Sequence, residues 1–84
     1  MDFWQEANSV NDREALSNFL LSAAQDFTDN PEGWENVDIP ALLEAMSAWI
    51  SDCDEVFRRS GKPLPSGETW ATVAKLVAAA RVYE

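Results

Sequence analysis

Histidine is absent from this chain of 84 residues, and cysteine occurs once, as Cys53. Without histidine the chain lacks the commonest general base, the usual partner of a serine or cysteine nucleophile, and the usual zinc ligand. A single cysteine cannot form a disulfide within the chain, so the sequence is not that of a small secreted disulfide-rich protein. These shortages predict a protein that is not an enzyme, needs no cofactor and is cytoplasmic.

Long hydrophobic runs are also missing. No apolar stretch reaches the roughly 18 residues that a membrane-spanning helix needs. The N-terminal segment MDFWQEANS has no basic residues followed by an apolar stretch, as a secretory signal would. We therefore expect no export signal and no membrane partner.

Basic residues are few, with six Lys and Arg against fifteen Asp and Glu and a formal net charge of −9. Proteins bind the phosphate backbone by displacing its counterions with Lys and Arg, so we expect no nucleic-acid partner. Residues 14–57 contain ten acids and no base, whereas residues 58–84 contain five bases and two acids. This asymmetry favours a basic protein as partner; the alternative is an ordinary solvated acidic face.

Apolar residues recur at steps of three and four, the spacing of amphipathic helices, in residues 11–28, 38–60 and 66–83. Asn11 and Asp38 are the expected N-caps of the first two helices, and either Ser66 or Thr69 opens the third. Gly61 is placed to end the second helix. No alternation typical of strands is present. The sequence predicts an all-α protein, a single domain of residues 1–84 built as a small three-helix bundle, with a short extra helical turn at its N-terminus.

Three apolar side chains are expected in the core because they lie on the predicted helix stripes: Trp49, Cys53 and Trp70. Trp34 is different, since it lies in a loop between Glu32 and Glu35. It either clamps the loop onto the helices or stands exposed as a binding anchor.

The acidic residues do not have metal-site spacing. Asp52 and Glu55 share one helix face, but Asp54 projects in another direction. The loop of residues 26–38 has the acid density of a calcium loop without its alternating ligands and its glycine at the sixth position. We expect no metal site.

Several groups of residues together resemble a family of small bacterial domains of unknown function. They are Asn30-Pro31-x-x-Trp34-x-Asn36, Leu43-Glu44-Ala45-Met46-x-Ala48-Trp49-Ile50-x-Asp52, a proline followed by Trp70, and Ala79-Ala80-x-Val82-Tyr83-Glu84. The resemblance covers about residues 30–84 and implies no activity and no catalytic residues. Size, acidity and helicity are also similar to those of bacterial immunity proteins, which bind and block a toxin; this likeness is one of class and not of motif.

The most concrete function that these features favour is a small acidic protein-binding module, immunity-like or antitoxin-like, that neutralises a basic toxin such as a nuclease. The alternative is a homo-oligomeric or assembly domain without catalytic activity. The candidate partner-binding residues are the acidic side chains of the stretch after the first helix, together with its loop tryptophan: Asp29, Glu32, Trp34, Glu35, Asp38, Glu44, Asp52 and Glu55.

Overall fold

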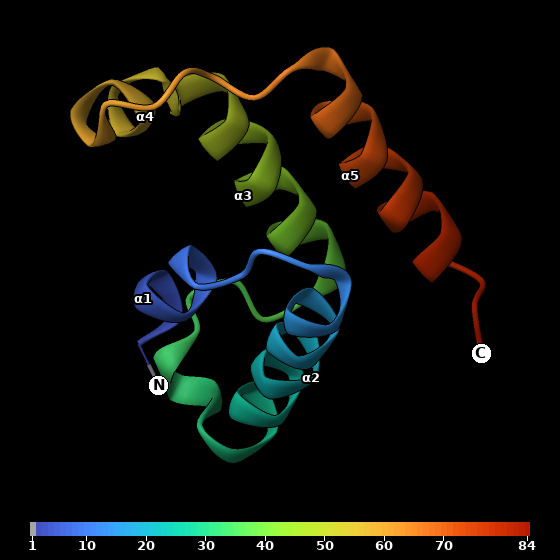
Figure 1. Cartoon of the computed structure of the whole chain (residues 1–84). Coiled ribbons are helices and arrows are strands. Elements are labelled where there is room, and N and C mark those ends of the chain that lie inside the picture. Colours follow the sequence, from blue (N-terminus) through green and yellow to red (C-terminus); the bar gives the residue numbers. More distant parts are fainter. Residues whose placement is uncertain (1) are drawn as a thin grey trace. The chain divides into compact units, whose positions relative to one another are not determined.

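The computed structural model describes residues 2–84, and this part of the chain is helical with no strand (Figure 1). The prediction of an all-α protein is therefore confirmed. Its elements are α1 (Phe3–Asn8), α2 (Arg13–Asp29), the 3-10 helix η1 (Pro31–Gly33), α3 (Ile39–Asp52), α4 (Asp54–Ser60) and α5 (Gly67–Ala80). The short helix α1 is the extra N-terminal element that the sequence predicted.

The helices are divided between two compact units, and the boundary lies inside α3. The first, called unit 1, ends at Ala45 and contains α1, α2, η1 and the first half of α3. The second, called unit 2, begins at Met46 and contains the rest of α3 with α4 and α5. The expected arrangement as one three-helix bundle is not confirmed.

Unit 1 is organised around the half-buried indole of Trp34. Its ring meets those of Phe3 and Phe27 edge-on, with centroid distances of 5.3 and 5.6 Å. Phe3 in turn contacts Phe19 of α2 at 6.1 Å, and the Trp34 Nε1–H donates to Asp26 Oδ2 at 2.9 Å. These contacts are those of a clamp that fastens α1 and the segment after η1 to α2.

Three helices begin at an aspartate whose side chain accepts a hydrogen bond from the backbone N–H three residues on. The distances are 3.1 Å for Asp2 and 2.7 Å for Asp12 and Asp38. The predicted cap Asp38 is confirmed, but α2 is capped by Asp12 and not by Asn11. An ionised carboxylate interacts with the positive end of the helix dipole in addition to the cap hydrogen bond, which favours Asp12 over its neutral neighbour.

In unit 2 the predicted helix of residues 38–60 is broken at Cys53, between α3 and α4. Residues eight apart in a continuous helix are separated by about 12 Å along its axis. The rings of Trp49 and Phe57 nevertheless have centroids only 6.4 Å apart. The break therefore lets α4 leave the axis of α3 and places Phe57 against Trp49.

Two side-chain hydrogen bonds lie at the break. The Ser51 hydroxyl donates back to the Ser47 carbonyl at 3.2 Å, a contact that tends to bend helices, and the Cys53 thiol donates to the Ile50 carbonyl at 3.2 Å. Asp54 and Glu55 then fall in the first turn of α4, where carboxylates suit a new helix start.

Burial confirms one of the three expected core residues and corrects another. Cys53 is 2% exposed and is the single fully buried residue of residues 2–84. Trp70 is half-buried. Trp49 is 41% exposed, so its expected place in the core was wrong, because its ring covers the α3–α4 bend instead of a continuous stripe.

The ends of α4 and α5 follow local rules. Gly61 ends α4 with a φ of 72°, the left-handed conformation that glycine adopts without a steric penalty. Of the two candidates, Ser66 and not Thr69 is the N-cap residue of α5, although its side chain makes no cap hydrogen bond. The helix α5 stops at Ala80 and leaves residues 81–84 outside it.

The two glycines of unit 2 give a matched prediction for stability. Gly61→Ala should lower the free energy of unfolding by about 1–2 kcal/mol, because an L-residue is strained at this φ. Gly67→Ala is the control: its φ is not positive, a Cβ there meets nothing within 4 Å, and it lies in α5. It should be neutral or stabilising by up to about 1 kcal/mol. Urea titrations that give both variants the same midpoint would contradict the left-handed cap.

The clamp gives a second prediction. Trp34→Phe keeps a ring between its neighbours but removes the N–H donated to Asp26, and should cost about 1–2 kcal/mol of stability. Trp34→Ala also removes the ring contacts and should cost about 2–4 kcal/mol, less than for a fully buried aromatic. Tyr83→Ala is the control, since Tyr83 is 85% exposed. Equal denaturation midpoints for Trp34→Ala and Tyr83→Ala would show that Trp34 is no clamp.

Candidate functional site

The charge of the protein is concentrated in one of its two units. Unit 1 carries ten carboxylates and one arginine, whereas unit 2 carries five carboxylates and five basic residues. The formal net charge of −9 therefore belongs entirely to unit 1, and unit 2 is neutral. The candidate functional surface is the acidic surface of unit 1.

Aspartate and glutamate have different roles in unit 1. All five of its aspartates accept a local hydrogen bond: Asp2, Asp12 and Asp38 as helix caps, Asp26 from Trp34, and Asp29 from Gln25 Nε2 at 3.0 Å. These bonds require an acceptor oxygen but not a surplus of negative charge. The aspartates are thus explained by the fold.

The glutamates are not explained in this way. Among residues 2–84, the five glutamates of unit 1 make no side-chain hydrogen bond or ion pair: Glu6, Glu14, Glu32, Glu35 and Glu44. Glu6, Glu14 and Glu32 lie in first helical turns, where the helix dipole favours them. Glu35 and Glu44 lack even this role, and all five side chains are exposed.

The eight residues predicted to bind a partner divide between the units. Asp29, Glu32, Glu35, Asp38 and Glu44 lie exposed in unit 1, together with the half-buried Trp34. Asp52 and Glu55 belong to unit 2. The sequence had grouped all eight because they lie in one stretch without a base, and only the six residues of unit 1 form part of the acidic unit.

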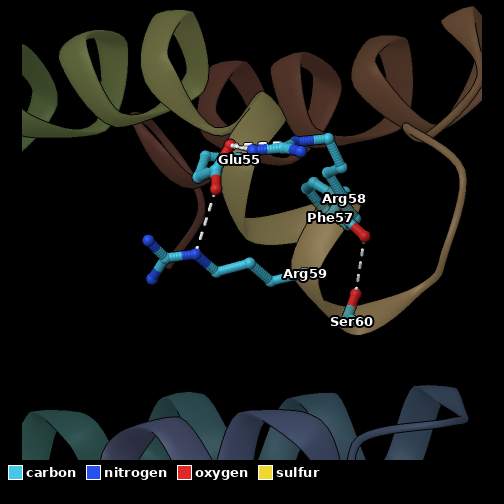
Figure 2. A network of polar contacts seen from close by, with 5 residues as sticks. All are labelled: Glu55, Phe57, Arg58, Arg59 and Ser60. Carbon is cyan, nitrogen blue, oxygen red and sulfur yellow. Dashed lines mark hydrogen bonds and ion pairs between the residues drawn. The ribbon is translucent and has the colours of Figure 1, made fainter.

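Glu55 is further set apart because its charge is offset locally (Figure 2). Its Oε1 accepts from Arg59 Nε at 3.0 Å, and its Oε2 accepts from Arg58 Nε at 3.0 Å and from Arg58 Nη2. Both carboxylate oxygens are occupied by guanidinium groups. Glu55 therefore adds little to a negative field.

An apolar hollow of about 350 Å³ opens in unit 1 beside these charges. Its lining comes from three segments: Ala23, Ala24 and Phe27 of α2, Trp34 with residues 36–38 of the connection, and Ile39 and Leu42 of α3. Sequence reasoning missed this hollow. Its one sequence signal is the apolar pair Val37 and Ile39, which flanks the cap residue Asp38 and is exposed by 57% and 74%.

Residues 2–84 contain no cluster of three or more His, Cys, Asp or Glu side chains that could hold a metal ion. In the same part of the chain, no helix has both the length and the apolar character required to cross a bilayer.

Residues 12–84 match the model of a family described as Family of unknown function (DUF7660). The chain belongs to this family. The match covers residues 12–45 of unit 1 and the whole of unit 2. No curated protein and no solved structure matches the chain.

The arginine pairs of Glu55 give a third prediction. Glu55→Gln should lower stability by about 0.4–1 kcal/mol at low salt, because two exposed ion pairs are weakened. Glu68→Gln is the matched control, since Glu68 also lies in a first helical turn but makes no ion pair. At about 1 M salt, where the charges are screened, unfolding titrations should give the Glu55→Gln and Glu68→Gln variants equal stabilities. A difference that persists at high salt would show that the pairs are not electrostatic.

Proposed function

We propose that this DUF7660 protein is a small acidic protein-binding module whose unit 1 takes a basic protein as partner. Most concretely, it is an immunity-like or antitoxin-like protein of the bacterial cytoplasm that neutralises a basic toxin such as a nuclease. The observation that supports the proposal is the distribution of charge: unit 1 carries the whole net charge of −9, and within residues 2–84 its glutamate side chains make no hydrogen bond or ion pair.

Such a charge distribution lowers stability but favours one class of partner. Like charges gathered on one small unit repel one another and lower its stability. They also create a field that accelerates encounter with a basic protein and discourages acidic ones. Because a nuclease binds the phosphate backbone with Lys and Arg, an acidic protein that covers those residues competes directly with the nucleic acid.

Homo-oligomeric assembly is the second candidate, favoured by the free cations of unit 2. Among residues 2–84, Lys62, Lys75 and Arg81 make no ion pair. In this arrangement the bases of one copy meet unit 1 of another. Mass measured by light scattering separates the candidates: the assembly function predicts oligomers that dissociate as salt rises, whereas a monomer at every ionic strength excludes it.

Charge-matched variants test the leading function. In the unit 1 variant, Glu32, Glu35 and Glu44 are changed to Gln, which removes three exposed charges without breaking a hydrogen bond of the fold. The tagged protein is used to capture proteins from extracts of its own cells, and the association rate of the captured basic protein is then measured by stopped flow. Association should slow by at least about tenfold at low salt, with the difference shrinking at high salt.

The control carries the same net charge with the changes in unit 2: Asp54→Asn, Glu68→Gln and Glu84→Gln. It should associate at nearly the wild-type rate, because the field of unit 1 is intact. Equal rates for the two variants would show that only total charge matters. Wild-type rates for both variants, or a captured protein that is not basic, would contradict the proposal.

A further inference from the structure

The hollow of unit 1 combines an apolar lining with negative charge at its edge. Two small residues of α2, Ala23 and Ala24, leave the space open, and Phe27 and Trp34 supply aromatic surface. The only polar residues of the lining are Asn36 and Asp38. Apolar concavities with few polar groups are typical of sites that receive a side chain or ligand from outside.

The apolar surface also extends outward from the hollow. Val37 and Ile39 line it but remain largely exposed, and Leu42 on the next turn of α3 is exposed by more than a third. Contiguous exposed apolar residues with a polar rim are typical of protein-binding surfaces. A partner side chain that entered the hollow would therefore find further apolar contacts around it.

The charge around the hollow selects what can occupy it. Asp38 forms part of the lining, and the Trp34 indole in the lining is bonded to Asp26. Glu35 adjoins Trp34 in the chain and is exposed, and its side chain makes no hydrogen bond or ion pair with the described residues. Within unit 1 the single arginine is Arg13, at the start of α2 and outside the lining. An occupant with basic side chains is favoured and an acidic one is disfavoured.

We propose that the hollow between α2, residues 34–38 and the start of α3 is the docking site for an apolar side chain carried on a basic helical segment of the partner protein. The proposal rests on the function inferred above and adds the place and chemistry of contact. The apolar anchor supplies desolvated contact in the hollow, and Lys or Arg residues beside it face Asp38 and Glu35. Charge speeds the encounter, and the anchor slows dissociation.

The probe is a synthetic amphipathic peptide of Leu and Lys, about 16 residues long with Leu at helical spacing. It is titrated into the full chain, and binding is measured by calorimetry and by the NMR signal of the Trp34 indole N–H. One comparison peptide has Glu in place of Lys, and another has the same composition in scrambled order. We expect the first peptide to bind, to shift the Trp34 signal and to bind at least about tenfold more tightly than either comparison peptide.

The variants place a leucine inside or outside the hollow. Ala24→Leu fills it and should weaken peptide binding by at least about tenfold. Ser17→Leu adds the same side chain to α2 outside the lining and should leave binding unchanged. Val37→Ser removes exposed apolar lining without touching a helix and should weaken binding as well, so that a folding defect in Ala24→Leu does not decide the result.

The outcomes separate the docking site from the proposed function. If neutralising the unit 1 glutamates weakens binding while Ala24→Leu and Val37→Ser do not, the hollow is not the site and the acidic function survives. If filling the hollow weakens binding but neutralisation does not, the occupant is not recognised by charge, and both proposals fail. The docking site would also be overturned if the scrambled peptide bound equally well. The same holds if a second copy of the chain occupied the hollow at high protein concentration and shifted the Trp34 signal without peptide.

Discussion

The hydrogen bond from Trp34 to Asp26 and the aromatic contacts around it are the constraint on which unit 1 depends. The indole of Trp34 lies in a connecting segment, and its ring partners Phe3 and Phe27 come from the helices α1 and α2. It is buried only by packing on those helices. Once it does, the segment that carries Glu32 and Glu35 is held against α2, and the hollow acquires one of its walls. Stability and the candidate site thus share one side chain.

Features governed by short-range chemistry could be read from the sequence. The cap Asp38 and the left-handed Gly61 depend on residues within one helical turn, so spacing and residue type were sufficient. The stretch Ser51-Asp52-Cys53-Asp54 held a signal that was overlooked. All four residues are weak helix formers, and Ser51 and Cys53 hydrogen-bond to backbone carbonyls of the preceding turn. The apolar spacing continues past them although the helix does not.

The remaining features are set by contacts that spacing does not encode. The pairing of Trp34 with Asp26 joins residues on either side of a chain reversal, and nothing in the sequence distinguishes Asp26 from its acidic neighbours. The hollow exists because three segments leave space beside Ala23 and Ala24. The partition of charge was visible as a run without bases, but the boundary inside α3 was needed to assign that charge to one unit.

That boundary has a consequence for how the chain can be shortened. α3 runs through it, and each unit holds only seven residues of the helix, 39–45 and 46–52. Nucleating a helix is costly, and isolated helices shorter than about 12–15 residues are marginal in water. A truncation at the boundary would therefore leave each half of α3 dependent on packing within its own unit, because neither half is long enough to be helical by itself. The two units are divided in packing yet share one helix.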